Sequence, residues 1–230
     1  GIESTFVDTT DKNAITDAIQ ANTKAIYVET PSNPTLKVTD LQQVANIAKA
    51  HHLLSIVDNT FLTPFYQRPL DFGFDIVVHS ATKFLGGHSD VIAGLVVARD
   101  EKLADRVKSL QNSFGAVLGV QDSWLILRGI KTLQARLELS TRNAEILAKW
   151  LQEQKEIVKV YYTGLSDHEG HHIQSKQSSG HGAVLSFDVG SEKRAKQLLK
   201  KIRLPLVAVS LGSVESILSY PAMMSHAAMP

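Results

Sequence analysis

Cysteine is absent from the 230-residue sequence, which excludes disulfide bonds and catalysis by a thiolate. The absence also agrees with a reducing compartment, and we expect a cytoplasmic protein. An excess of charge of one sign is lacking too, because 24 basic residues are balanced by 23 acidic ones. A net charge of +1 produces no field that would gather nucleic acid or an anionic membrane. We therefore expect a small molecule as the binding partner.

Long apolar runs are also missing. No uninterrupted apolar stretch reaches the roughly 18 residues of a membrane-spanning helix, and no secretory signal is recognisable. Hydrophobic residues nevertheless make up 43% of the chain and charged residues 20%. A chain of this length buries roughly 70–75% of its unfolded surface. The composition therefore predicts a folded protein with one large core or two smaller ones.

Short apolar runs rich in β-branched residues alternate with segments of helical period in the first half of the chain. We expect strands at residues 3–7, 25–29, 53–57, 74–78 and 91–98, and helices at 11–21, 40–48 and 101–111. This alternation favours an α/β fold with a mainly parallel sheet and helices on both faces. Farther along, we expect one long helix from 120 to about 151, a helix at 192–201, and strands at 158–162, 183–189 and 207–210.

The loop after the strand at 74–78 combines residues that suit a phosphorylated aldehyde. Ser80 and Thr82 flank Lys83, and Gly86 and Gly87 follow closely. Hydroxyls donate hydrogen bonds to a phosphate, glycines allow a tight turn, and a partly desolvated lysine can condense with a carbonyl. We therefore predict that Lys83 carries the chemistry.

A carboxylate occupies the corresponding position on the preceding strand. Asp58 ends the apolar run at 53–57, 25 residues before Lys83. Ligands of open α/β sheets bind at the carboxyl ends of the strands. A carboxylate beside a pyridine nitrogen keeps that nitrogen protonated, so Asp58 and Lys83 together indicate pyridoxal 5'-phosphate as the cofactor.

Four motifs resemble one enzyme family in both order and spacing. They are residues 29–34 (Glu-Thr-Pro-Ser-Asn-Pro), residues 57–61 (Val-Asp-Asn-Thr-Phe), the Lys83 loop, and residues 210–216 (Ser-Leu-Gly-Ser-Val-Glu-Ser). The chain resembles the cystathionine-type pyridoxal-phosphate enzymes of cysteine and methionine metabolism: cystathionine γ-lyase, β-lyase and γ-synthase, and methionine γ-lyase. The resemblance implies fold type I, with a seven-stranded type of sheet in the large domain.

The resemblance also implies roles for single residues. Lys83 would be the lysine that forms the Schiff base with the cofactor, and Asp58 the partner of the pyridine nitrogen. Ser80 and Thr82 would donate hydrogen bonds to the cofactor phosphate. Each of these positions matches the family motif residue by residue.

Two further assignments rest on the same resemblance. Asn33 would lie near the phenolic oxygen of the cofactor and contact the substrate. Ser210 would lie near the substrate carboxylate and Lys83. The structural alternatives are a turn residue before Pro34 for Asn33, and the end of a strand for Ser210.

The resemblance further implies how the chain is organised. Residues 1–134 would form part of the cofactor-binding domain, and residues 135–230 a truncated, smaller α+β domain. Compared with the family, the chain lacks an upstream glycine-rich phosphate turn and a downstream arginine that binds the substrate carboxylate. We therefore expect a fragment of a longer protein, whose full-length form is a homo-oligomer built as a dimer of dimers.

The activity implied for the full-length protein is elimination from cystathionine or a related sulfur amino acid. Its products would be a thiol or cysteine, a 2-oxo acid and ammonia. Residues 113–119 and 220–226 most resemble bacterial lyases of this kind. The alternative is γ-replacement on an O-acyl-homoserine, as in cystathionine γ-synthase, because both reactions use the same cofactor machinery.

One motif points to different chemistry. His168-Glu169-Gly170-His171-His172 satisfies the H-E-x-x-H pattern of zinc hydrolases, in which two histidines on one helix bind the metal. The glycines and polar residues around it show no helical period, so a surface loop is the structural alternative and we expect no metal. A third possibility is a nucleotide-binding module, but neither characteristic glycine-rich phosphate motif is present.

Overall fold

The computed structural model describes residues 1–224. The strands are β1 (Ala25–Glu29), β2 (Leu54–Asp58), β3 (Ile76–Ser80), β4 (Gly94–Ala98), β5 (Lys159–Tyr161), β6 (Ser186–Asp188), β7 (Leu206–Val207) and β8 (Ile217–Leu218). The α-helices are α1 (Lys12–Asp17), α2 (Leu41–Ala50), α3 (Thr63–Tyr66), α4 (Glu101–Phe114), α5 (Val120–Ile130), α6 (Leu133–Gln152), α7 (His171–Gln177) and α8 (Glu192–Lys201). Two 3₁₀ helices are η1 (Pro69–Phe72) and η2 (Pro221–Met223).

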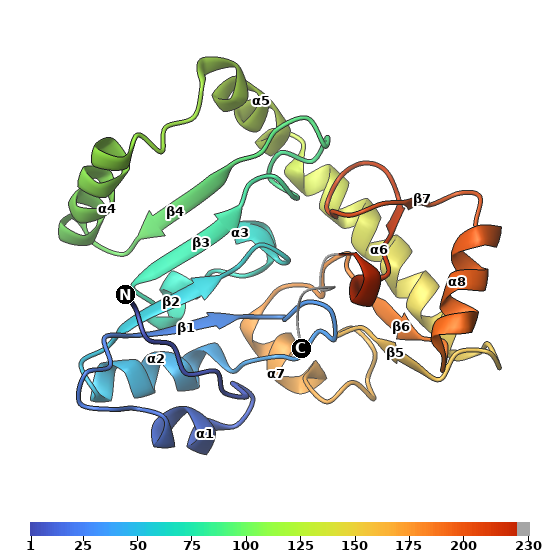
Figure 1. The fold of residues 1–230 in the computed structure, drawn as a ribbon, viewed down its shortest axis with the longest axis horizontal. Coiled ribbons are helices and arrows are strands. Elements are labelled where there is room, and N and C mark those ends of the chain that lie inside the picture. The colour runs from blue at the N-terminus through green and yellow to red at the C-terminus, as the bar shows by residue number, and fades with distance from the viewer. Residues whose placement is uncertain (225–230) are drawn as a thin grey trace.

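Four strands in the order β1-β2-β3-β4 form the main sheet (Figure 1). β1, β2 and β3 are parallel, whereas β4 runs antiparallel to β3. The register places Glu29 opposite Asp58 at the carboxyl ends of β1 and β2. The predicted mainly parallel α/β sheet is thus confirmed over the strands described.

The core of this half lies between the sheet and α2. Val28, Val57 and Val77 are buried, one from each parallel strand, and they pack against α2 residues such as Leu41 and Val44. Because side chains alternate between the two faces of a strand, the residue after Val57 points to the opposite face. Burial of the valines therefore directs the strand-terminal polar residues away from α2.

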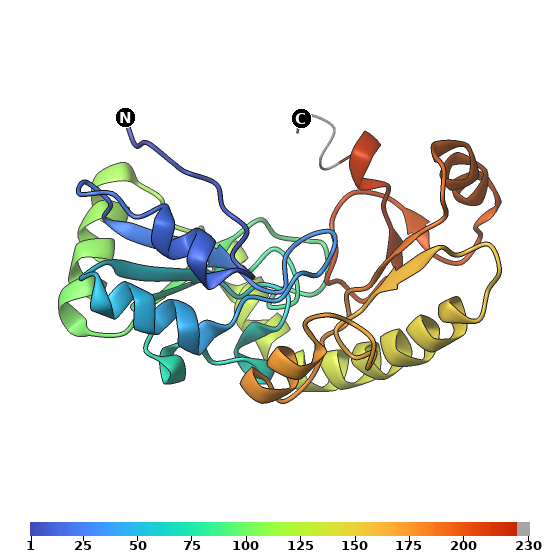
Figure 2. The same ribbon diagram turned by 90° about the horizontal axis from the view of Figure 1, so that it is seen from below.

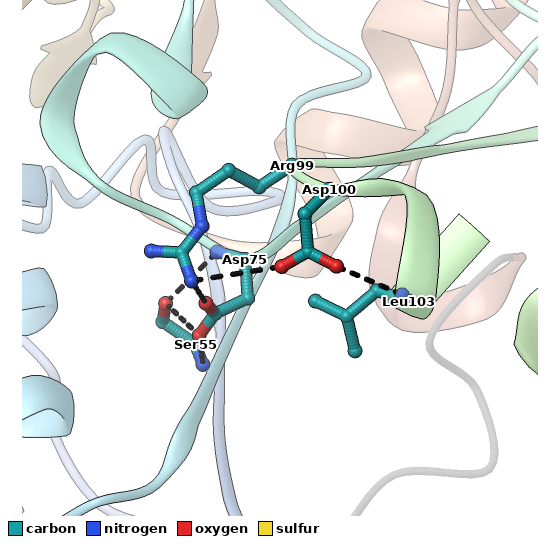
Figure 3. A network of polar contacts seen from close by, with 5 residues as sticks. All are labelled: Ser55, Asp75, Arg99, Asp100 and Leu103. Atoms are coloured by element: carbon teal, nitrogen blue, oxygen red, sulfur yellow. Dashed lines mark hydrogen bonds and ion pairs between the residues drawn. The ribbon is translucent and has the colours of Figure 1, made fainter.

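A polar network joins β2, β3 and β4 at the end of the sheet opposite these polar residues (Figure 3). Asp75 accepts hydrogen bonds from the backbone N–H and the hydroxyl of Ser55, at 2.8 and 2.9 Å. The guanidinium of Arg99 lies 2.9 Å from the other Asp75 oxygen. Next to it, Asp100 caps α4 by accepting from the N–H of Leu103. The network connects β2, β3 and β4 at the end of the sheet that lies away from the site.

The second half of the chain packs along α6 (Figures 1 and 2). β5 and β6 form an antiparallel pair, and β7 and β8 a parallel one. Ala144 and Ala148 of α6 share a small core with Tyr162 and Leu165. The expected boundary between residues 134 and 135 stays a prediction, and α6 crosses it.

Two expectations about the elements were wrong. Residues 3–7 do not form a strand, because no neighbouring strand pairs with them, and Phe6 is 96% exposed. The single helix expected from 120 to about 151 is two helices, α5 and α6, with a break at Lys131 and Thr132. There the Gly129 carbonyl accepts from the N–H of Thr132, three residues on, so the α-helical ladder is interrupted.

Across residues 1–224, none of the helices combines the length and hydropathy that crossing a bilayer requires. The lyase-like segment 220–226 ends outside the described residues, which stop at Met224.

Candidate functional site

A cavity of about 680 Å³ opens at the carboxyl ends of β1, β2 and β3, where the C-terminal segments β6 to η2 close over the sheet. Its lining includes Asn33, Asp58, Ser80, Lys83 and Ser210. These are five of the six predicted site residues, and they come from positions spread over most of the chain. Parallel strands bring four of them together, because their carboxyl ends lie at one edge of the sheet, whereas Ser210 comes from the loop between β7 and β8.

Lys83 lies in the turn that follows β3. Its backbone N–H donates to the Ser80 carbonyl at 3.1 Å, and its own carbonyl accepts from the N–H of Gly87 at 2.8 Å. The side-chain Nζ donates to the hydroxyl of Ser210 at 3.0 Å. Burial lowers the pKa of the Lys83 amine, because a charged ammonium is poorly solvated there. A larger fraction of this lysine is therefore neutral and nucleophilic than of an exposed one.

Asp58 ends β2, and Thr60 connects it to the Lys83 turn. One oxygen of the Asp58 carboxylate accepts from the Thr60 N–H at 2.9 Å. The Thr60 hydroxyl accepts from the Ser80 N–H at 2.8 Å. The ends of β2 and β3 are thus held beside each other, with Asp58 and Lys83 facing the same cavity.

Glu29 is a cavity residue to which the sequence interpretation gave no role. It pairs with Asp58 in the register of β1 and β2 and lines the cavity. Burial and repulsion by the Asp58 carboxylate raise the pKa of Glu29 to about 7, and the backbone N–H of Asn33 opposes this shift. Glu29 ends the expected strand at 25–29, just as Asp58 follows the expected strand at 53–57. Aligning the ends of these two strands would therefore have identified Glu29 as a neighbour of Asp58.

Thr82 is the predicted residue that does not line the cavity. Its hydroxyl donates to the Ala93 carbonyl at 3.2 Å and accepts from the Ala93 N–H at 3.0 Å. These bonds attach the Lys83 turn to the segment before β4. The role of Thr82 toward a phosphate stays a prediction, and it would require the hydroxyl to give up its bond to the Ala93 carbonyl.

Ser210 belongs to a loop that presses on the Lys83 turn. Its φ angle is 101°, a backbone conformation that residues other than glycine rarely adopt. A side chain at Gly212 would bring its first carbon within 2.7 Å of the Phe84 nitrogen. The N–H of Val214 donates to the Gly87 carbonyl at 3.0 Å. The close approach of the two loops is what places the Ser210 hydroxyl at the lysine.

The H-E-x-x-H motif does not form the helical arrangement that zinc hydrolases use. His168 precedes α7, which begins at His171, and its Nδ1 accepts from the N–H of Gly170. His168 and Glu169 line a different cavity, of about 720 Å³. Within residues 1–224, no cluster of three or more His, Cys, Asp or Glu side chains has the geometry of a metal site. The structure therefore does not favour the zinc alternative.

Comparison with known proteins relates the whole chain to one family. The family model described as "Cys/Met metabolism PLP-dependent enzyme" matches residues 1–230. The chain is 58% identical over 230 residues to the cystathionine β-lyase MetC of Bacillus subtilis, covering 100% of this chain and 59% of the relative.

Two solved structures have the same fold. One is cystathionine γ-lyase from Lactobacillus plantarum in complex with L-serine, with a TM-score of 0.96 and 44% identity, covering 98% of this chain and 59% of that one. The other is cystathionine γ-synthase from Xanthomonas oryzae pv. oryzae, with a TM-score of 0.95 and 42% identity, covering 97% and 58%. The predicted α/β fold of pyridoxal-phosphate enzymes is thereby confirmed.

The chain spans about 60% of the length of these relatives. The family match nevertheless extends from the first residue to the last, and it includes all four motifs at the site. Dependence on pyridoxal phosphate is part of the family's description, as the Lys83 and Asp58 pair had indicated. The chain belongs to the Cys/Met metabolism family of pyridoxal-phosphate-dependent enzymes.

Proposed function

We propose that this protein is a pyridoxal-phosphate-dependent carbon–sulfur lyase that acts on cystathionine or a related sulfur amino acid. The observation that carries the proposal is that the Nζ of Lys83, hydrogen-bonded to Ser210, shares a cavity with Asp58. The 58% identity to a cystathionine β-lyase supports this substrate class.

The donor set of the cavity fits pyridoxal phosphate. An aldehyde needs an amine that is neutral part of the time, and burial lowers the pKa of Lys83. A pyridinium nitrogen needs a carboxylate, which Asp58 provides. A phosphate needs N–H and O–H donors, and the cavity contains the Ser80 hydroxyl. Asn33 offers an amide for the phenolic oxygen. The volume of about 680 Å³ lies within the range of cofactor sites.

The bound cofactor would supply an electron-withdrawing ring that makes the Cα–H of an amino acid acidic. Lys83 would hold the cofactor and then take the proton from Cα at its Nζ, as its lowered pKa favours. Ser210 would orient that Nζ through the 3.0 Å hydrogen bond. Asp58 would keep a proton on the ring nitrogen. Ser80 and Thr82 would hold the phosphate.

The net reaction breaks a carbon–sulfur bond and consumes water. β-Elimination from cystathionine yields a thiol, pyruvate and ammonia, whereas γ-elimination yields cysteine, 2-oxobutyrate and ammonia. γ-Replacement on an O-acyl-homoserine is the second candidate, and likeness to a cystathionine γ-synthase favours it. Replacement releases a carboxylate and no ammonia, so the products separate the candidates.

The proposal extends to assembly and location. We propose a homo-oligomer built as a dimer of dimers for the full-length protein, on the basis of the family resemblance. We also propose a cytoplasmic location, with which the cysteine-free composition agrees. Size-exclusion chromatography with light scattering would measure the assembly state.

Covalent labelling tests the proposal. The protein is incubated with pyridoxal phosphate, reduced with borohydride, digested and mapped by mass spectrometry. We expect the label on Lys83 and its loss in Lys83→Arg, whereas Lys37→Arg, at an exposed position, keeps it. Label spread over many lysines, and unchanged in Lys83→Arg, contradicts the proposal. Incubation of the loaded protein with cystathionine, followed by measurement of ammonia and the 2-oxo acid, then identifies the reaction.

A further inference from the structure

Arg136, in the first turn of α6, is a cation that lies half-buried beside the Lys83 turn. No acidic side chain among residues 1–224 forms an ion pair with it. Burial lowers the pKa of its guanidinium, because a charge is less well solvated there. A half-buried cation without a carboxylate must obtain its hydrogen bonds from other groups.

The guanidinium of Arg136 donates to two backbone carbonyls and to one side-chain hydroxyl. Nη1 donates to the carbonyl of Phe84, the residue after Lys83, at 2.8 Å. Nη2 donates to the carbonyl of Gly129 in α5, also at 2.8 Å. Nε donates to the hydroxyl of Thr132 at 3.1 Å. One planar group thus connects the Lys83 turn to the break between α5 and α6.

Two glycines make this connection possible. The guanidinium lies so close to Gly87 that a side chain at Gly87 would overlap it. On the other side, a side chain at Gly129 would overlap the Gly86 carbonyl and come within 2.6 Å of the Leu85 carbonyl. The Lys83 turn therefore packs against α5 and the first turn of α6, and the Arg136 side chain bonds to both the turn and α5.

The same turn receives the Ser210 loop, since the Gly87 carbonyl accepts from the N–H of Val214. If the carbonyl of Phe84 were released, the turn would lose a charged hydrogen bond next to Lys83. The 3.0 Å contact between Lys83 and Ser210 depends on where that turn lies. A displacement of about 1 Å in such a place costs up to about a hundredfold in rate.

We infer that Arg136 is a positioning residue, which acts through the Phe84 carbonyl to hold the Lys83 amine in its half-buried place beside Ser210. The inference deepens the proposed function, on which it rests, by taking Lys83 as the cofactor lysine. Arg136 does not line the cavity, so its effect is on the exposure and reactivity of the Lys83 amine.

Competitive acylation without cofactor tests the inference directly. Acetic anhydride is applied across a pH series, and modification of Lys83 is measured by peptide mass spectrometry relative to the exposed Lys102. In Arg136→Met, the released turn exposes Lys83, so its titration midpoint rises and its reactivity at neutral pH falls about tenfold. Arg136→Lys, which offers one ammonium in place of the planar guanidinium, gives an intermediate titration midpoint for Lys83.

Arg142→Met, at an exposed position of the same helix, is the matched control and keeps the wild-type profile. Overlapping profiles for Arg136→Met and wild type, at equal melting temperature, overturn the inference. If Arg136→Met does not fold, Arg136→Lys decides: an intermediate profile supports the inference and a wild-type profile overturns it. Borohydride labelling of the wild type is a separate measurement. Absence of label on Lys83 in the wild type would contradict the proposed function, whereas unchanged acylation in Arg136→Met would contradict only the positioning role.

Discussion

The amine of Lys83 and the hydroxyl of Ser210 lie 3.0 Å apart, although 127 residues separate them in the chain. The contact joins the turn after β3 to a loop between the short strands β7 and β8. Because Lys83 is a donor and Ser210 the acceptor, the hydroxyl fixes the direction of the amine as well as its distance.

Comparing Ser210→Gly with Ser210→Ala separates the effect of losing the hydroxyl from the effect of the backbone conformation. Both variants lose the bond to Lys83, but only glycine accepts a φ of 101° without strain. We expect Ser210→Gly to be about 1 kcal/mol more stable than Ser210→Ala in urea unfolding. The same pair of substitutions at Ser166, an exposed residue without a positive φ, should show no advantage for glycine. Equal stabilities for the two Ser210 variants would show that the conformation carries no strain.

Asp58→Asn tests the carboxylate at the end of β2. An amide keeps the shape and can still accept from the Thr60 N–H, but it cannot hold a proton on a pyridine nitrogen. We expect exchange of the Cα proton of cystathionine in D₂O, catalysed by the loaded protein, to slow at least about a hundredfold. NMR measures the exchange, and the melting temperature should not change. Asp90→Asn, at an exposed position in the Lys83 loop, is the control; near-normal exchange in Asp58→Asn would refute the assigned role.

Glu29 should make stability depend on pH between about 4.5 and 7. Its pKa in the folded protein is raised from 4.5 to about 7, so the folded state retains a proton that the unfolded state loses. The stability that protonated Glu29 contributes is fully present below pH 4.5 and is lost as the pH rises through 7. Part of the side chain is exposed, so solvent screens the repulsion and we expect a loss of about 1 kcal/mol.

Glu29→Gln removes this dependence. We expect the variant to be more stable than wild type at pH 8 and equal to it at pH 4.5, as measured by urea unfolding at both values. Glu3→Gln, at an exposed position near the N-terminus, should leave the pH profile of unfolding unchanged. A constant difference between Glu29→Gln and wild type at both pH values would exclude the raised pKa.

Gly129→Ala tests how closely α5 approaches the Lys83 turn. Alanine in place of glycine within a helix is ordinarily stabilising by about 1 kcal/mol. Here the added carbon would meet the carbonyls of Leu85 and Gly86, so we expect destabilisation of about 2–3 kcal/mol. Thermal unfolding measures the change. Gly119→Ala, at the N-cap of α5, whose added carbon lies 3.6 Å from Asp122, should cost less, about 0.5–1 kcal/mol, because a glycine cap is lost but no atoms overlap.

Local patterns predicted the strands of the main sheet well, because a strand depends on short-range order. Apolar runs such as 53–57 and 74–78 identified β2 and β3 to within about two residues. Since parallel strands end at the same edge, the positions of Asp58 and Lys83 in the sequence were enough to place them in one cavity. The break between α5 and α6 could not be predicted, because residues 120–151 have a helical period throughout, and the bonds that interrupt it involve Gly129 and Arg136.

Sequence patterns alone were sufficient for the order of β1 to β4, the family, and the presence of an amine and a carboxylate at neighbouring strand ends. Three contacts required the folded structure: Ser210 with Lys83, Glu29 beside Asp58, and the Thr82 hydroxyl with Ala93. The difference lies in the separation along the chain of the residues that make each contact. Periodicity and turn residues encode neighbours along the chain, whereas these contacts arise from strand register and loop packing between distant segments.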